Sequence, residues 1–370
     1  MATAMASASS EQAVSLHTGQ RSERMQRVVV DHFGGPDVLR VVEEDVPRPG
    51  PGEVRVRVLA AGVSFTDALL RAGTYLGGPK PPFTPGYELV GVVEDVGPGC
   101  LRLREGDRVG ALTVWGADAE RVCVPEKYAV AVPEDLDPAE VVSLIFPYMT
   151  AYQMLHRTAK VQRGETVLVH GAAGRVGTAA LELGAVAGLR LIGTASARDC
   201  AAVERLGAVA IDYRNEDFLA RVRELTGGAG VDVVLDGIGG AVSLRSFRAL
   251  RVGDPITGDP GGRLIMIGNY NTMVQGRKSW RGGIEWLAAT AIVWLWGTLS
   301  PRRQVMGYRV QKLRIPHQDW FREDFRALLE LLREGKIHPV VAERLPLSEA
   351  RRAHEMLERS AAKGKLVLVP

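Results

Sequence analysis

The chain has 370 residues, of which 24% are charged and 46% are hydrophobic. These are ordinary globular proportions, so collagen-like and wholly disordered chains are excluded. The net charge of +3 is too small to indicate binding to nucleic acid or to an anionic membrane. The length allows two or three domains, or one large α/β unit, with ample core.

Cysteine usage bears on the redox environment. The three cysteines, Cys100, Cys123 and Cys200, are odd in number and widely spaced. No disulfide framework and no CxxC metal motif can be drawn from them, so we expect a reducing, cytoplasmic setting.

Residues 1–24 are rich in Ala, Ser and polar side chains and contain no apolar run of secretory length. We expect a disordered tail that precedes the fold.

Short β-segments separated by Gly and Pro dominate residues 27–125. Val54 to Val58 alternates apolar and charged side chains with period two, as a half-buried strand does. Further β-segments are predicted at 27–30, 38–42, 89–96 and 108–112, with Pro-Gly turns at 47–52, 77–86 and 97–99. This part predicts an all-β unit, a small barrel.

Helices and strands alternate from Pro138 onward. Helices are predicted at 139–144 and 150–156, and then at 176–187, 201–206, 217–225, 244–250 and 348–358. Strands are predicted at 166–170, 190–194, 209–212, 231–235 and 263–267, with a last one at 365–369. Such alternation is typical of a parallel sheet with right-handed crossovers.

Residues 284–299 are apolar or small apart from Glu285, and four of the six tryptophans lie in or beside this stretch. Its length falls short of the roughly 20 residues that span a bilayer, so no transmembrane segment is expected. Three interpretations stay open: a buried or partly exposed helix, a lining for an apolar substrate, and an interfacial membrane anchor.

A glycine-rich turn follows the predicted strand 166–170 and opens the next helix. It consists of Gly171, Ala172, Ala173, Gly174, Arg175, Val176 and Gly177. Glycines three apart permit a sharp turn and a close approach of the backbone to a ligand, and the helix N-terminus offers free N–H groups. In this strand–turn–helix context the motif predicts a site for the pyrophosphate of a dinucleotide.

The end of the second strand indicates which dinucleotide binds. NAD sites usually place an acidic residue there, whereas this chain has Thr194 and Ser196, which leave room for a 2′-phosphate. Arg198 is placed to neutralise that phosphate, and Tyr213 after the third strand is a further contact. Asp199 argues the other way, but the balance favours NADP(H).

Seven motifs along the chain resemble the medium-chain dehydrogenase/reductase superfamily, in its zinc-independent quinone oxidoreductase branch, which includes zeta-crystallin. They are residues 62–67 with 71–75, 85–91, 106–109, 149–152, 171–177, 236–240 and 363–367, and the resemblance extends from about Met25 to Pro370. The segment from Asn269 to Tyr308 is also similar to the vesicle amine transport-like subgroup.

The resemblance implies an α/β fold in which a Rossmann domain with a doubly wound parallel sheet packs on a chaperonin-10-like (GroES-like) β-barrel domain. The implied bounds are 25–147 for the catalytic domain, completed by 314–370, and 148–313 for the Rossmann domain. Family members are often dimers through an edge of the Rossmann sheet, so a homodimer is expected.

The metal ligands of zinc-dependent relatives are replaced in this chain. Ser64 stands where those relatives have Cys, and Tyr87 stands before Glu88 where they have His. The four-Cys structural cluster is also missing, since Cys123 is alone in its region. A zinc site needs three or four ligands in one place, so we expect chemistry without a metal.

The resemblance implies hydride transfer from NADPH to a quinone or to an α,β-unsaturated carbonyl, a small and hydrophobic substrate. It places Thr150, Ile238, Gly268 and Asn269 beside the cofactor and Ser64 on the other side of the nicotinamide. Tyr75 and Tyr87 are the hydroxyl groups that we expect to supply a proton.

Two other functions stay open. One is an enoyl-thioester reductase or a tailoring reductase of a biosynthetic pathway. The other is a cofactor-binding protein with little turnover that acts on membranes or partners through residues 284–299.

Overall fold

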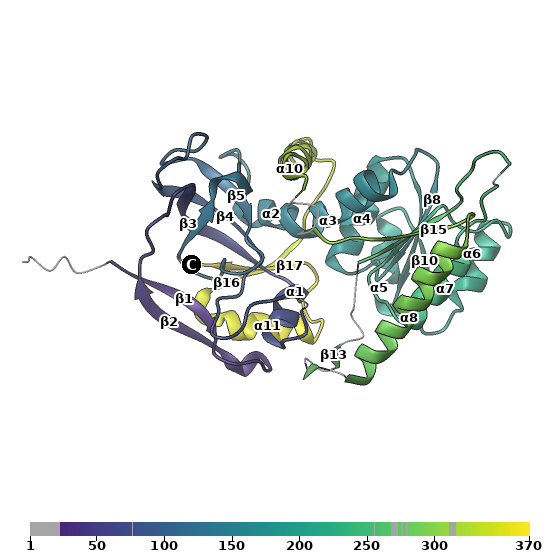
Figure 1. Cartoon of the computed structure of the whole chain (residues 1–370), viewed down its shortest axis with the longest axis horizontal. Helices are drawn as coiled ribbons and strands as arrows, with labels where there is room; N and C mark the ends of the chain where they lie inside the picture. The colour runs from purple at the N-terminus through teal and green to yellow at the C-terminus, as the bar shows by residue number, and fades with distance from the viewer. Residues whose placement is uncertain are drawn as a thin grey trace, which may run out of the picture.

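The computed structural model describes residues 23–75, 77–254, 256–267, 273–274, 277–278, 280–310 and 316–370. Figure 1 shows two lobes, one rich in antiparallel strands and the other built on a parallel sheet, with a helical stretch between them. The predicted site residues Gly268 and Asn269 lie outside the described residues, and so does most of the predicted tail.

The β-rich lobe contains the predicted alternating strand and is closed by the C-terminus. The strand order of its main sheet is β16-β17-β3-β4-β5-β7, with β6 also paired to β3. Val54, Val56 and Val58 point into the core and are at most 3% exposed, as the period-two pattern predicts. The strands are β3 (Glu53–Val63), β4 (Glu88–Val96), β5 (Arg108–Leu112), β6 (Arg121–Pro125), β7 (Ala129–Ala131), β16 (Val341–Pro346) and β17 (Lys365–Val369).

Strand β17 runs antiparallel to β3, with Leu366 opposite Val63 and Leu368 opposite Ala61. The end of the chain is therefore part of this lobe, and Lys365 is placed next to the end of β3. The hairpin of β1 (Arg24–Val30) and β2 (Leu39–Asp45) flanks the sheet. Short helices complete the lobe: η1 (Pro36–Val38), α1 (Phe65–Arg71), η2 (Glu126–Tyr128), η6 (Leu347–Glu349) and α11 (Ala350–Glu358).

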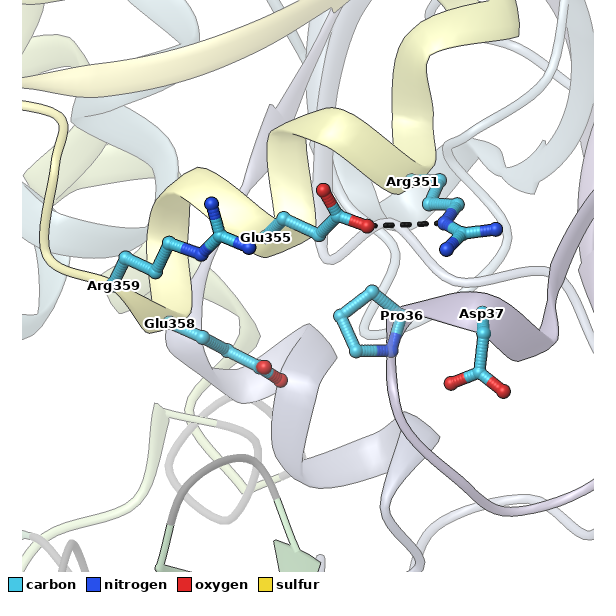
Figure 2. A pocket seen from close by; sticks show the side chains of 6 residues that line it. All are labelled: Pro36, Asp37, Arg351, Glu355, Glu358 and Arg359. Carbon is cyan, nitrogen blue, oxygen red and sulfur yellow. Dashed lines mark hydrogen bonds and ion pairs between the residues drawn. The ribbon is translucent and has the colours of Figure 1, made fainter.

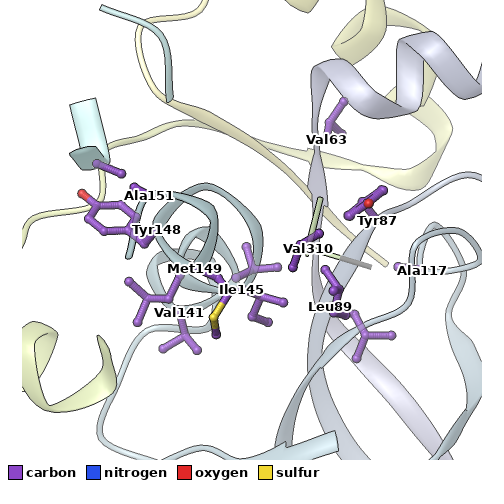
Figure 3. Close-up of a cluster of buried hydrophobic side chains, with 14 of the residues drawn as sticks. Val63, Tyr87, Leu89, Ala117, Val141, Ile145, Tyr148, Met149, Ala151 and Val310 are labelled. Carbon is purple, nitrogen blue, oxygen red and sulfur yellow. The ribbon is translucent and has the colours of Figure 1, made fainter. Parts of the chain in front are cut away.

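A continuous helical stretch at 138–159 joins the lobes and contains both helices predicted there. It consists of α2 (Pro138–Ser143), η3 (Leu144–Tyr148), α3 (Met149–Tyr152) and η4 (Gln153–Ala159), and η3 and η4 have π-helical turns. The Asp137 side chain caps its start by accepting from Ala139 N–H. Figure 3 shows its side chains Val141, Ile145 and Met149 near Leu89 and Tyr87 of the β-rich lobe. Helix α10 (Gln318–Arg333) packs on α3 and η3.

The second lobe has the predicted alternation. Its strands are β8 (Thr166–His170), β9 (Arg190–Ala195), β10 (Val209–Asp212), β11 (Val233–Asp236), β12 (Arg263–Met266) and β15 (Gln304–Gly307). They are parallel and lie in the order β10-β9-β8-β11-β12-β15. This is the doubly wound order with its switch point between β8 and β11, which confirms the predicted fold class. The helices of the lobe are α4 (Arg175–Val186), α5 (Ala197–Arg205), α6 (Phe218–Leu225) and α7 (Ala241–Ala249).

The predicted apolar helix is α8 (Trp280–Leu299), which follows the short strands β13 (Met273–Val274) and β14 (Arg277–Lys278). It packs on α7 and β15 and buries Ala289 and Val293. Its outer face exposes large apolar side chains, among them Ile284 at 66% and Leu295 at 55%. Within the part of the chain that the structure describes, no helix is both long and apolar enough to cross a membrane.

Candidate active site

Residues 171–177, the phosphate turn, lie where β8 ends and α4 begins. Gly171 has a φ of +66°, which favours glycine, and Gly174 caps the helix. A Cβ at Gly177 would lie 2.3 Å from the carbonyl oxygen of Gly171, so only glycine permits this close packing of the helix on the turn. The first N–H groups of α4 have no carbonyl partner within the helix, and they suit a pyrophosphate.

A second turn lies beside the first at the carboxyl edge of the sheet. The Asp236 carboxylate at the end of β11 accepts hydrogen bonds from the backbone N–H groups of Ile238 and Gly239. This positions the Ile238 side chain, whose Cδ1 would lie 3.7 Å from a Cβ at Gly171. The structure thus brings the two predicted cofactor segments, far apart in sequence, into contact range.

The residues predicted for the ribose end lie after β9. The Thr194 hydroxyl forms a hydrogen bond inside the protein, with Nδ1 of the buried His170 at 3.0 Å. Ser196 Oγ and Arg198 Nε both donate to Asp199, at 2.8 and 3.1 Å. These donors help to keep the pKa of Asp199 below its usual value, even though burial opposes that shift.

Lys363 also lies here, although it is not among the predicted cofactor residues. Its Nζ lies 3.8 Å from Asp199, so cations from two distant segments flank one carboxylate. Tyr213 is exposed after β10, where its backbone N–H donates to Ala195 O at 3.1 Å, and the guanidinium of Arg214 lies over its ring.

On the opposite side lies a buried ion group of Ser64, Glu88 and Lys365. The Lys365 ammonium donates to Ser64 Oγ at 2.7 Å and also to the Glu88 carboxylate. The Ser64 hydroxyl donates to Glu88 Oε1 at 3.1 Å. All three side chains are at most 3% exposed, and burial lowers the pKa of Lys365 and raises that of Glu88.

The ion group places the Lys365 nitrogen between Ser64 and Glu88, where this chain lacks the zinc ligands of zinc-dependent relatives. A Cβ at Gly62 would meet Glu88 Oε1 at 2.4 Å and Lys365 Nζ at 2.7 Å, so glycine at this place makes room for the ammonium. Among the described residues, no group of three or more His, Cys, Asp or Glu side chains is arranged to hold a metal ion.

Two further buried carboxyl groups surround the ion group. Asp67 accepts from the N–H groups of Ser64 and Gly86, and burial followed by the charge of Glu88 raises its pKa to about 7. Burial also raises the pKa of Asp118, whose carboxylate oxygens make no hydrogen bond. Burial therefore favours the protonated, neutral form of the carboxyl groups of Asp67, Glu88 and Asp118 on this side of the site.

Arg175 connects the phosphate turn with the ion group. Its Nε donates to the carbonyl oxygen of Gly364 at 3.1 Å, one residue before Lys365. Its charge also acts on Glu88 and favours the ionised carboxylate. The two sides of the candidate site are thus joined by a direct hydrogen bond between lobes.

The predicted proton donors Tyr75 and Tyr87 contact each other. Their hydroxyl oxygens lie 3.1 Å apart, and their rings meet edge to face. Tyr87 is 1% exposed and packs against Phe146, whereas Tyr75 is only half-buried. Of the two, Tyr75 is the one that a ligand can reach.

Thr150 lies at the start of α3, which packs on α4. It is 5% exposed, and its hydroxyl oxygen makes no hydrogen bond of good geometry. A buried hydroxyl without a partner is costly, so this atom fits a polar group that a cofactor brings.

A surface hollow of about 210 Å³ lies elsewhere, between η1 and α11. Figure 2 shows its charged lining, in which Arg351 and Glu355 form an ion pair. None of the predicted site residues lines it, so it is separate from the candidate site.

Comparisons with known proteins agree with this fold. The family model of the alcohol dehydrogenase GroES-like domain matches residues 50–134, and that of the zinc-binding dehydrogenase matches 206–368. The chain is 34% identical over 356 residues to 2-haloacrylate reductase of Burkholderia sp, a match that covers 92% of this chain and 98% of that protein. It is 31% identical to the human synaptic vesicle membrane protein VAT-1 homolog, covering 93% and 86% of the two chains.

A solved structure gives a similar result. Escherichia coli quinone oxidoreductase complexed with NADPH superimposes with a TM-score of 0.80 at 30% identity, covering 93% of this chain and 100% of that one. These likenesses extend over both lobes and confirm the resemblance seen in the motifs. This chain therefore belongs to the medium-chain dehydrogenase/reductase superfamily, in its quinone oxidoreductase-like branch, and is an oxidoreductase that uses a nicotinamide cofactor.

Proposed function

We propose that this chain is an NADPH-dependent reductase that transfers hydride to a quinone or to an α,β-unsaturated carbonyl compound without a catalytic metal. The observation that carries the proposal is the phosphate turn, tied by Arg175 to a buried ammonium at the position of a metal site. The names of the relatives support the two substrate classes, since one is a quinone oxidoreductase and another a 2-haloacrylate reductase.

The cofactor would extend along the carboxyl edge of the sheet. Residues 171–177 would hold the pyrophosphate, Ile238 would cover it, and Thr150, with Gly268 and Asn269, would contact the nicotinamide, which supplies the hydride when bound.

Arg198 and Lys363 would bind a 2′-phosphate, with Ser196 leaving room for it and Tyr213 beside it. Asp199 already lies between these two cations, so they would offset its repulsion of the phosphate. This arrangement supports NADP(H) over NAD(H).

Proton transfer would come from the other side. Hydride addition leaves negative charge on the substrate, and Tyr75 is the accessible hydroxyl that can neutralise it, with Tyr87 fixing its orientation. The Ser64 hydroxyl donates its hydrogen bond to Glu88 and accepts one from Lys365, so it has no proton to offer a substrate. Ser64 would therefore position the ammonium, whose charge favours an anion on the substrate.

We further propose the domain bounds that the sequence indicated, with 25–147 and 314–370 forming the catalytic domain and 148–313 the Rossmann domain. Cys100, Cys123 and Cys200 are free thiols, which supports a reducing compartment such as the cytoplasm.

A homodimer is also part of the proposal. Strand β15 is last in its sheet, and its outer edge pairs with no described strand. Helix α8 lies beside that edge, and apart from Arg281, Glu285 and Thr298 its exposed side chains are apolar. An open strand edge next to an apolar helix suits a second copy of the same chain, because a two-fold axis would pair both features at once. Light scattering should show that the wild-type chain is a dimer. The double variant Ile284→Lys, Leu295→Lys should be a monomer.

The experiment that tests the function is NADPH oxidation by the purified chain with a panel of acceptors. Turnover with phenanthrenequinone or an enone supports the proposal, and turnover restricted to crotonyl-type thioesters would favour the enoyl-thioester reductase instead. Tight NADPH binding with no turnover on either set would favour a binding protein. A chain that oxidised NADPH only after zinc was added would contradict the metal-free mechanism.

A further inference from the structure

A chain of buried hydrogen bonds leads from α7 through β8 to β9, at the start of the phosphate turn. Ser246 Oγ on α7 lies 2.9 Å from Nε2 of His170, the last residue of β8. Nδ1 of the same ring lies 3.0 Å from the Thr194 hydroxyl on β9. The three side chains are 0%, 6% and 3% exposed, so their polar atoms must find their partners within the protein.

One backbone carbonyl determines the direction of each of these bonds. The Ser246 hydroxyl donates to Val242 O at 2.8 Å, because a carbonyl oxygen can only accept. The Ser246 oxygen therefore accepts from His170, whose ring carries a proton on Nε2. A neutral imidazole with its proton on Nε2 has an acceptor at Nδ1, so the Thr194 hydroxyl donates to His170.

The surroundings keep the His170 ring neutral. An imidazolium would present an N–H group to Thr194 as well, and the Thr194 proton would then lose its acceptor, because the other neighbour of that hydroxyl is the N–H group of Gly171. Burial also lowers the pKa of His170, and the charge of Arg245 on α7 acts in the same direction, whereas Asp236 at the end of β11 opposes it. The ring is therefore a donor at one nitrogen and an acceptor at the other.

Thr194 in turn holds the start of the phosphate turn at two points. Its carbonyl oxygen accepts from Ala172 N–H at 3.0 Å. Its hydroxyl oxygen, whose proton points to His170, accepts from Gly171 N–H at a longer distance of 3.4 Å. Gly171 O then accepts from Gly174 N–H at 2.9 Å. These three N–H groups are used within the protein, and those at the start of α4 remain for a phosphate.

Resting on the function proposed above, we infer that His170 is a positioning residue for the pyrophosphate of the cofactor. Its ring accepts the Thr194 proton, which turns the Thr194 oxygen toward Gly171 N–H and keeps the turn in the shape that directs the first N–H groups of α4 to a phosphate. Thr194 then acts from the protein side of the turn and does not itself contact the cofactor.

The test replaces one ring nitrogen at a time and measures NADPH binding by isothermal titration calorimetry. In His170→Asn the amide oxygen lies near the place of Nδ1 and can accept from Thr194, so the affinity should stay within about twofold of the wild type. In His170→Gln the longer amide reaches Ser246 and leaves Thr194 without this acceptor. His170→Gln and Thr194→Val should each bind NADPH about fivefold more weakly, and their double variant no more weakly than either one.

Two controls locate the effect. Thr166→Val is the matched variant, because it makes the same exchange at a buried threonine at the opposite end of β8, and it should keep the wild-type affinity. The second control is 2′-AMP, a ligand that has the adenosine 2′-phosphate but no pyrophosphate. Its affinity should be the same in all variants. If His170→Gln does not fold, Thr194→Val, which keeps the shape of the side chain, tests the same contact.

An independent readout is the His170 ring itself. Long-range ¹H–¹⁵N NMR spectra at neutral pH, in which the signal missing from His170→Asn identifies the residue, should show a neutral ring with its proton on Nε2. A proton on Nδ1, or on both nitrogens, would overturn the inferred hydrogen-bond directions.

The outcomes separate the two proposals. Wild-type NADPH affinity in both His170→Gln and Thr194→Val, or an equal loss in His170→Asn and His170→Gln, would overturn the positioning role and leave the proposed function standing. A parallel loss of NADPH and 2′-AMP would also overturn it, because the effect would not lie at the pyrophosphate. A folded wild-type chain that bound neither ligand would overturn the proposed function, and the positioning role with it.

Discussion

The phosphate turn is formed by seven consecutive residues that lead into the free N–H groups at the start of α4, and it contains no acidic residue. Across from it, the ion group joins Ser64, the N-cap residue of α1, with Glu88 of β4 and Lys365 of β17, and Asp67 and Asp118 lie close by. One side therefore depends on backbone geometry and the other on buried charges. Backbone sites tolerate changes of pH and fail when a side chain intrudes, whereas buried charges fail when one partner is lost.

The largest effect should come from removing the ammonium. Lys365→Met leaves Glu88 buried without its cation, and the expected loss in the free energy of unfolding is about 3–5 kcal/mol. Urea denaturation measures it, with Lys363→Met as control, because Lys363 is 81% exposed only two residues away. Equal losses in both variants would mean that burial of the charge is irrelevant. Adding Glu88→Gln to Lys365→Met should recover part of the loss.

The second prediction concerns the phosphate turn. Gly174→Asp places a carboxylate where the pyrophosphate would bind, and NADPH affinity should fall at least about 100-fold, or roughly 2.7 kcal/mol. Quenching of protein fluorescence by NADPH measures this. Gly174→Ala adds a Cβ 3.1 Å from Gly171 O but no charge. This variant separates the steric effect from the effect of charge, and its NADPH affinity should fall much less. Unaltered affinity in the Asp variant would show that the cofactor binds elsewhere.

The third prediction is that the buried groups of the β-rich side make stability depend on pH. His354 is fully buried and accepts from Arg71, and burial followed by the Arg71 charge lowers its pKa to about 3. The unfolded chain then binds more protons, so this contribution to stability is lost as the pH falls from about 6.5 toward 3. The slope approaches about 1.4 kcal/mol per pH unit.

The measurement is the difference in unfolding free energy between the wild-type chain and His354→Gln, whose amide oxygen can still accept from Arg71. This difference should shrink as the pH falls. Asp67 provides the opposite sign, since its raised pKa of about 7 means that its contribution is lost as the pH rises from about 3.8 toward 7. A parallel pH profile for wild type and His354→Gln would refute the assignment.

The smallest effect is expected at the ribose end, where the cations are exposed. Arg198→Ala should weaken the binding of NADPH about fivefold and leave the binding of NADH almost unchanged. The effect is small because an exposed ion pair contributes little to the free energy of binding. Arg205→Ala, at the exposed end of the same helix, is the control and should change neither affinity. Equal weakening of NADPH and NADH by Arg198→Ala would remove its role at the 2′-phosphate.

Much of the fold could be read from local pattern. Period-two alternation at Val54–Val58 and the strand–turn–helix at 166–187 depend on neighbours in the sequence, so they are visible without the tertiary structure. The family motifs extended this to the whole chain. Helix α1 is not predicted because it is short, and α10 is not predicted because no family motif covers residues 318–333.

The sequence by itself determined the phosphate turn. Its strand, glycines and helix follow one another directly in the chain, so the conformation of each depends on local steric limits. What only the tertiary structure decided is which distant side chains meet: Lys365 with Glu88 and Ser64, Lys363 with Asp199, and Tyr308 with Gln153 and Asp324. The physical reason is that a buried charge or hydroxyl is stable only beside its partner. That partner is supplied by the packing of strands and helices, which no local pattern records.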